Sequence, residues 1–254
     1  MRSALVFTFA APLASFGAVA VGERRPSWDR PGKSQVIGLL CCALGIERAD
    51  EVRQAEVAES LKLAIRIDDP GHLATDYHTT QVPPQRRNRR FATRAEELNL
   101  PKRELKTILS RREHRVGSRY TIAVWYEPDR PEMLDRLRTR LREPAFLLFA
   151  GRKAFPLMLP PHPQIVTLDD GIEPAFQAYD DHLNDDIREL LASVTPRRRY
   201  RPQIFVDADA VPRSQPVDRI EERRDIPENR GKWRFGLRSE VMLRQSRPNE
   251  EPAS

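Results

Sequence analysis

Hydrophobic and polar positions along the chain predict five short strands. The first is predicted over 4–10, where large apolar residues alternate with smaller ones as in a buried strand. β-branched and aromatic residues predict further strands at 61–67 and 120–126, and short apolar runs predict strands at 146–149 and 204–206. This spacing leaves room for helices between the strands.

Two helices are predicted from their end signals. Ser34 is the expected N-cap of the first, which is apolar on most sides and ends at Gly45. Pro131 opens the second, which stops before Pro144 and has its leucines on one face. The resulting order, strand-helix-strand, insert, strand-helix-strand, predicts an α+β fold with a ferredoxin-like (RRM-like) βαββαβ core.

The chain divides into three predicted parts. Residues 1–160 are expected to form the ferredoxin-like domain, with an inserted thumb at about 77–118 that is too long for a plain loop. Residues 161–244 are expected to form a smaller, less regular C-terminal region with an acidic helix near 174–193. The tail, 245–254, is expected to be disordered.

The positive charge is concentrated in one segment. The 254 residues carry a net charge of +6, but residues 85–119 hold twelve Lys/Arg against four Glu, a local net of +8. One concentrated stripe is what binding to a phosphate backbone requires, so RNA is the expected partner. A basic protein at an acidic membrane surface is the alternative from another class.

The arginines of the insert are the main candidate RNA ligands, because a guanidinium fits phosphate oxygens and also stacks on bases. A charged loop that contacts only water is the other interpretation of the same run. The candidates are Arg86, Arg87, Arg89, Arg90, Arg111, Arg112 and Arg115.

Two further positions could meet a phosphate. In Gly151-Arg152-Lys153 the glycine permits close backbone approach and two cations follow, although an ordinary turn has the same composition. Lys33 and Ser34 stand where the free N–H groups of a helix start favour an anion, although simple N-capping by Ser34 explains that residue equally.

No motif of metal, cofactor or nucleophilic chemistry is found. The two cysteines are adjacent, the five histidines lack metal-ligand spacing, and no phosphate-binding P-loop is present, so neither metal nor cofactor is expected. Asp207 and Asp209 are carboxylates that could pair, or an ordinary exposed strand pattern. A metal-independent ribonuclease remains an alternative, with His114 or His78 as its first acid or base.

The apolar N-terminus, 4–20, imitates a secretory signal. The strand-like alternation within it, together with Pro12 and Gly17, argues against one. No other stretch approaches the roughly 20 apolar residues that a membrane helix needs, so the expected location is the cytoplasm, with no membrane partner.

Six stretches, taken in order, resemble the CasD proteins of type I-E CRISPR Cascade complexes. They include the loop APLASFG, the helix PGKSQVIGLLCCALG, the motif DYHT, the motif SRRE before a strand, and the turn within PAFLLFAGRKAFPL. The stretches are 5–17, 31–45, 76–79, 110–113 followed by 120–125, 144–157, and 224–227 with 235–240.

The resemblance implies a Cas-five subunit of the RAMP group, at the foot of Cascade. Such a subunit hooks the 5′ handle of the CRISPR RNA (crRNA), and its thumb contacts the RNA and the neighbouring backbone subunit. The large subunit that recognises the PAM docks beside it, so target DNA is met only indirectly. Another subunit cuts the precursor in type I-E, which implies a non-catalytic protein, although a type I-C relative does cut RNA.

Carried over by position, the resemblance implies roles for the candidate residues. Arg111 and Arg112 are expected to contact RNA near the thumb base, with Tyr77 and His78 beside the handle. The turn Gly151-Arg152-Lys153 and the helix start Lys33-Ser34 are expected at handle phosphates. His114-Arg115 stands where the family often has an aromatic residue, and Phe155 replaces its cysteine.

Overall fold

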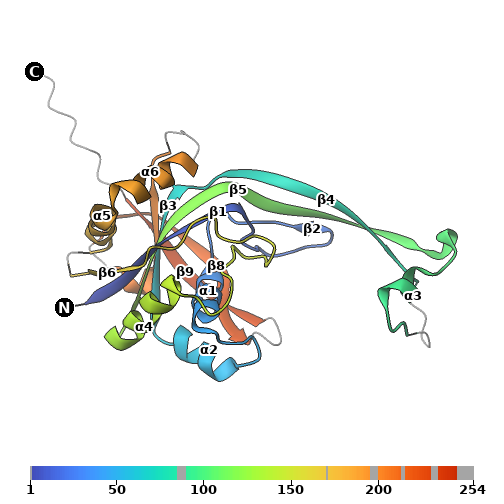
Figure 1. The fold of residues 1–254 in the computed structure, drawn as a ribbon, viewed down its shortest axis with the longest axis horizontal. Coiled ribbons are helices and arrows are strands. Elements are labelled where there is room, and N and C mark those ends of the chain that lie inside the picture. The colour runs from blue at the N-terminus through green and yellow to red at the C-terminus, as the bar shows by residue number, and fades with distance from the viewer. Residues whose placement is uncertain are drawn as a thin grey trace, which may run out of the picture.

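The computed structural model describes residues 2–84, 90–169, 171–194, 200–212, 215–229 and 234–244. Within them, one nine-stranded sheet runs in the order β6-β1-β5-β3-β7-β9-β8, with β2 and β4 also paired to β5 (Figure 1). The strands are β1 (Ser3–Ala14), β2 (Arg24–Arg25), β3 (Leu61–Asp69), β4 (His72–Val82), β5 (Lys106–Tyr126), β6 (Gln164–Thr167), β7 (Gln203–Asp207), β8 (Val217–Asn229) and β9 (Arg234–Leu243).

Helices cover both faces of this sheet. The α-helices are α1 (Lys33–Leu44), α2 (Glu51–Ala58), α3 (Arg94–Leu98), α4 (Pro131–Arg142), α5 (Ile172–His182) and α6 (Asp185–Val194), with short 3₁₀ turns η1 (Lys102–Glu104) and η2 (Ala208–Ala210). Figure 1 places α1, α2 and α4 below the strands, α5 to their left and α6 above them. The sheet therefore has a separate hydrophobic core on each side. Its mixed composition, with a large antiparallel sheet, confirms the coarse α+β prediction.

The first helix ends where predicted but begins before the predicted cap. Gly45 is the C-cap and adopts the left-handed conformation with φ 71°. The N-cap is Gly32, so the prediction of Ser34 as N-cap is wrong. The amide of Lys33 is bound by Asp225, a residue 192 positions away, and a local pattern cannot reveal that partner. The helix predicted from Pro131 is confirmed as α4.

The prediction of a fourth strand at 146–149 is wrong. Phe149 makes only an isolated bridge to Pro156, within a small turn. The strand that flanks β1 is β6, with Ser3 opposite Thr167 and Val6 opposite Gln164. An apolar run alone does not specify a strand, because a strand also needs a neighbour for its backbone groups.

The helix predicted at 174–193 is two helices. α5 ends at His182, and the Asn184 side chain accepts a 2.8 Å hydrogen bond from the Ile187 amide at the start of α6. Asparagine favours such a cap over a helix interior, which explains the break. The prediction of a less regular C-terminal region is also wrong, because β7, β9 and β8 extend the same sheet. The tail predicted as disordered lies outside the described residues.

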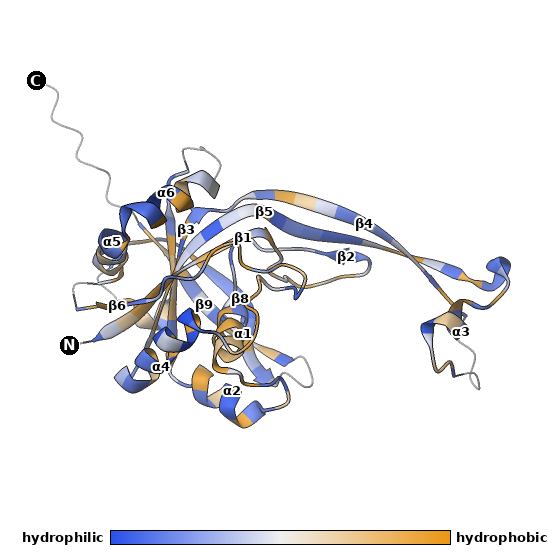
Figure 2. Ribbon diagram, in the orientation of Figure 1, coloured by the Kyte–Doolittle hydropathy of each residue, from blue (hydrophilic) through white to orange (hydrophobic). Residues whose placement is uncertain are grey.

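A long two-stranded ribbon projects from the sheet. β4 pairs with the first half of β5, from His72 opposite Val116 to Val82 opposite Lys106, and α3 lies near its tip (Figure 1). β5 has 21 residues and continues from the ribbon into the core between β1 and β3. Hydrophilic residues dominate the ribbon while apolar ones gather in the body (Figure 2). The segment 77–118 falls largely in this ribbon.

No described helix is both long enough and apolar enough to cross a membrane.

Candidate nucleic-acid interface

Three strands meet at the root of the ribbon. β2 runs parallel to β5, with Arg24 beside Arg111 and Arg25 beside Arg112. On the other side of β5, Tyr77 lies opposite Arg111 and Asp76 opposite Arg112. Side chains aligned across a sheet share a face and successive ones alternate, so this root has two cationic faces.

The first face carries Arg24, Arg111 and Tyr77. The Arg24 guanidinium donates to Glu113 Oε1 from Nε at 2.8 Å and from Nη2 at 2.6 Å, which ties β2 to β5. Tyr77 is 59% exposed, and no described residue hydrogen-bonds to the Arg111 side chain. Arg115, further toward the body, is half-buried and donates from Nε to the Trp28 carbonyl at 3.2 Å. An exposed ring beside a cation offers a surface for one stacked base.

The second face carries Arg112 and Asp76, with His78 and His114 around that carboxylate. Asp76 Oδ2 lies 3.8 Å from His78 Nε2 and 3.6 Å from His114 Nδ1. The turn after residue 150 brings Arg152 to this side, where its Nη2 is 3.4 Å from the Glu113 carbonyl. Burial first, and the nearby Arg112 charge second, lower the pKa of Arg152, while the Asp76 carboxylate opposes this shift. The two cations therefore repel each other, and a further anion near both would reduce that repulsion.

Gly151 is required by the backbone rather than by a ligand. Its φ is +84°, and a Cβ there would lie 1.9 Å from the Ser15 carbonyl oxygen. Ser15 also donates its amide to the Ala150 carbonyl at 3.0 Å, which fixes this turn against the end of β1. The glycine therefore positions Arg152 and exposed Lys153 beside the ribbon.

The start of α1 is occupied by carboxylates of the same chain. The Lys33 amide donates to Asp225 Oδ2 at 2.8 Å, and its Nζ donates to Asp207 Oδ2 at 2.7 Å. Asp207 is buried whereas Asp209 is exposed, so the two residues do not form an exposed pair of carboxylates. The prediction of a phosphate site at Lys33 and Ser34 is therefore wrong, because the ammonium and the amide of Lys33 already have carboxylate partners.

These carboxylates belong to a buried ionic network that joins α1 to β7, β8 and β9. Arg238 donates to Asp225, to Asp207 at 2.7 Å and to Glu240 at 2.9 Å. Burial alone would raise the pKa of Asp225, but hydrogen bonds and charge from Arg238, then Arg223, hold it below its ordinary value. Arg30 bridges Glu221 and Glu240 and lies over the Phe205 ring. Paired burial of this kind leaves no charge free for RNA.

The predicted residues therefore divide into three groups. Tyr77, His78, Arg111, Arg112 and the turn at 151–153 are brought together at the ribbon root, with Arg115 just beneath. Arg90 is exposed toward the tip, and Arg86, Arg87 and Arg89 lie outside the described residues. Lys33 belongs to the ionic network instead, next to Ser34 in the first turn of α1.

Arg24 and Arg25 were missed by sequence reasoning. They lie in a stretch rich in proline, glycine and charge that is typical of a loop. Their place beside Arg111 and Arg112 comes from a two-residue strand pairing across 87 positions. No periodicity in so short a strand could have signalled it.

The described residues contain no cluster of three or more His, Cys, Asp or Glu that could hold a metal ion. His114, the first candidate for a catalytic acid or base, is 9% exposed and packs its ring 5.9 Å from that of Phe155. The root thus brings together exposed cations, an exposed tyrosine ring and two histidines.

Comparison with known proteins places the chain. A model of the CRISPR-associated Cas5 protein family matches residues 4–240, almost all of the sequence. The chain belongs to this Cas5 family. Among curated relatives of this Cas5 protein, the Cascade subunit CasD of Escherichia coli K12 is 29% identical over 168 residues, 63% of this chain and 70% of the relative.

Solved structures share the fold of this Cas5 chain. One, from a CRISPR RNA-guided surveillance complex, has a TM-score of 0.59 at 22% identity and covers 94% of this chain and 89% of its own. A second, described as a Cas protein, has a TM-score of 0.56 at 20% identity, with 94% and 95% covered.

Proposed function

We propose that this Cas5 chain is a non-catalytic subunit of a Cascade-type CRISPR surveillance complex and that it holds the 5′ handle of the crRNA at the ribbon root. The observation that carries the proposal is the pair of cationic faces there. Arg111 and Arg112 are exposed, and neither makes an ion pair with a described carboxylate, although Asp76 is the cross-strand neighbour of Arg112. Family membership supplies the class of complex.

The two faces imply how the RNA runs. Residues 111 and 112 point to opposite sides of the ribbon, so a single straight strand cannot meet both arginines from one side. We propose that the handle passes around the free edge of β4. It would contact Arg112 and Arg152 on one face and Arg111 with Tyr77 on the other. The RNA phosphates on each face of the ribbon would then lie near an arginine.

We also propose that the sheet contains a ferredoxin-like core. The proposed ferredoxin-like core consists of β1, α1, β3, β5, α4 and β6, whose strands are adjacent in the order β6-β1-β5-β3 with both helices on one side. The ribbon is the proposed thumb, reaching toward the backbone subunit. The large PAM-recognising subunit is the second proposed protein partner, and the cytoplasm is the proposed location.

The test is reconstitution. The chain should be co-expressed with the other Cascade subunits and a CRISPR array, and the bound RNA should be recovered and sequenced. We expect a short RNA of defined 5′ end that is lost when Arg111, Arg112 and Arg152 are all replaced by alanine. A complex that forms with normal handle occupancy in that variant would overturn the assignment.

A further inference from the structure

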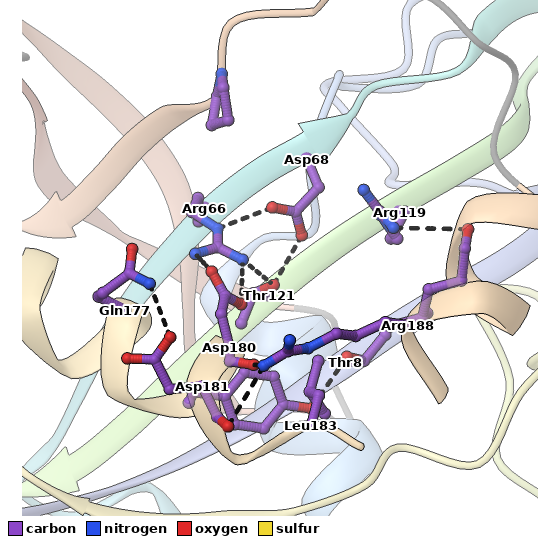
Figure 3. A pocket seen from close by; sticks show the side chains of 13 residues that line it. Thr8, Arg66, Asp68, Arg119, Thr121, Gln177, Asp180, Asp181, Leu183 and Arg188 are labelled. Atoms are coloured by element: carbon purple, nitrogen blue, oxygen red, sulfur yellow. Dashed lines mark hydrogen bonds and ion pairs between the residues drawn. The ribbon is translucent and has the colours of Figure 1, made fainter. Parts of the chain in front are cut away.

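A polar pocket lies on the face of the sheet that α5 and α6 cover, away from the ribbon root. Its volume is about 630 Å³, within the range of sites for small organic ligands. Strands β1, β3 and β5 form its floor, and Figure 3 shows side chains from α5 and α6 reaching over it. Neither the family resemblance nor the proposed RNA path uses it.

The floor is polar because three strands place polar residues in register. Thr8 lies opposite Thr121, and Thr121 lies opposite Arg66. Neighbouring positions on the same face, such as Val6 and Ala123, are apolar core residues. A sheet face that buries an arginine must also supply hydrogen-bond and charge partners for it. The polar residues that interrupt this apolar face are therefore a coherent group.

Arg66 is fully engaged within the pocket. It donates to both oxygens of Asp180 at 2.7 and 2.8 Å, to Asp68 at 2.7 Å and to the Thr121 hydroxyl at 3.0 Å (Figure 3). Burial alone would lower the pKa of Arg66, but the Asp68 and Asp180 carboxylates raise it above its ordinary value. Arg66 and these two carboxylates thus satisfy one another and form a fixed wall.

Arg119 and Arg188 are differently placed. The buried Nε of Arg119 has no hydrogen-bond partner among the described residues, and its Nη1 reaches only the Leu191 carbonyl at 3.5 Å. Arg188 donates to the carbonyls of Asp180 and Asp181, and its nearest carboxylate, exposed Asp185, is 3.8 Å away. Among the described residues, Arg119 therefore makes no ion pair and keeps an unused donor, while Arg188 has only the long 3.8 Å ion pair to exposed Asp185.

The remaining lining suits the rest of a nucleotide. Leu183, Leu191 and Pro202 supply an apolar wall for a base. Asp181 accepts one hydrogen bond from Gln177 on Oδ1, which leaves its second oxygen for a sugar hydroxyl. We propose that this pocket binds a nucleoside monophosphate, with Arg119 and Arg188 on the phosphate and the apolar wall against the base.

Calorimetric titration of the full chain with adenosine 5′-monophosphate tests the proposal, with adenosine and inorganic phosphate titrated separately. We expect one site, with adenosine at least tenfold weaker because it lacks the phosphate. Arg119→Met keeps the apolar stem and should weaken nucleotide binding at least tenfold. Arg136→Met, on an exposed helix position across the sheet, is the matched control and should change nothing.

Several outcomes would overturn this assignment. They are no nucleotide binding at millimolar concentration, equal binding of adenosine, or unchanged affinity in a folded Arg119→Met variant. If that variant does not fold, Arg188→Gln decides, since Arg188 is half-exposed and its loss spares the floor. Loss of nucleotide binding on replacing Arg111 and Arg112 instead would assign the site to the ribbon, which keeps the two proposals separable.

Discussion

Arg111 and Arg112 are consecutive in β5 yet project from opposite faces of the ribbon, one aligned with Tyr77 and the other with Asp76. One face of the ribbon therefore cannot present both arginines to the same stretch of RNA. The same geometry makes each arginine separately testable, because each would meet a different phosphate.

Replacing each arginine by alanine should weaken binding of single-stranded handle RNA. The slope of log K against log salt should fall by about 0.7 for each phosphate that is no longer neutralised, and by about 1.4 in the double variant. Fluorescence anisotropy at several salt concentrations measures it. Arg136→Ala, a cation of the body, should leave the slope unchanged, and an unchanged slope in the double variant would contradict the interface.

Gly151→Ala should destabilise the whole protein. The added Cβ meets the Ser15 carbonyl at 1.9 Å and the residue keeps a positive φ, so we expect a loss of about 2–3 kcal/mol in the free energy of unfolding. Urea denaturation measures it. Gly17→Ala is the control, since nothing lies within 4 Å of its Cβ. Equal stability of the two variants would contradict the role given to Gly151.

Shortening the ribbon should spare the body. Thr79 pairs with Leu109 in register, so residues 80–108 can be replaced by Asn-Gly to close a tight hairpin. We expect a thermal midpoint close to that of the intact chain, because exposed residues predominate in the described part of the deleted segment. Assembly with the other subunits should fail. An unfolded product would show that the ribbon is part of the core.

Stability should fall at acid pH through Asp225. Its pKa in the folded protein is below the ordinary 3.8, so the unfolded chain takes up the proton first. The stabilisation is complete above about pH 4 and is lost as the pH falls toward the folded value. Denaturation between pH 6 and 3 should show a shallower loss in Asp225→Asn.

Asp209→Asn is the matched control for this loss, because Asp209 is exposed and outside the buried network. It should keep the wild-type pH dependence. Identical curves for Asp225→Asn and the wild type would remove Asp225 from the explanation.

The purified chain should not cleave CRISPR repeat RNA in the absence of metal. His114 is buried against Phe155, so an RNA substrate could not reach its ring as it could reach that of exposed His78. Gel analysis of labelled repeat RNA checks this. Defined cleavage that disappears in His114→Ala or His78→Ala, but persists in His72→Ala, would favour the ribonuclease alternative.

Signals from neighbouring residues predict where the helices α1 and α4 end or begin. Gly45 ends α1 because its left-handed conformation suits glycine, and Pro131 opens α4 because its ring is preset for a first turn. The range predicted for β1 is too short, because Pro12 is typical of a strand end. Pairing on either side of that proline, Ala11 with Ser118 and Leu13 with Val116, carries the strand through.

The chain by itself determined some of the element types, among them β1, β3, α1 and α4, together with the concentrated charge and the family likeness, since these depend on neighbouring residues or on ordered motifs. Only the tertiary structure decided which charges are available. It placed Arg24 beside Arg111, closed the start of α1 with Asp225, and put β6 rather than 146–149 beside β1. The physical reason is that ion pairs and strand pairing join residues far apart in sequence, and each cation goes to whichever anion the fold brings near.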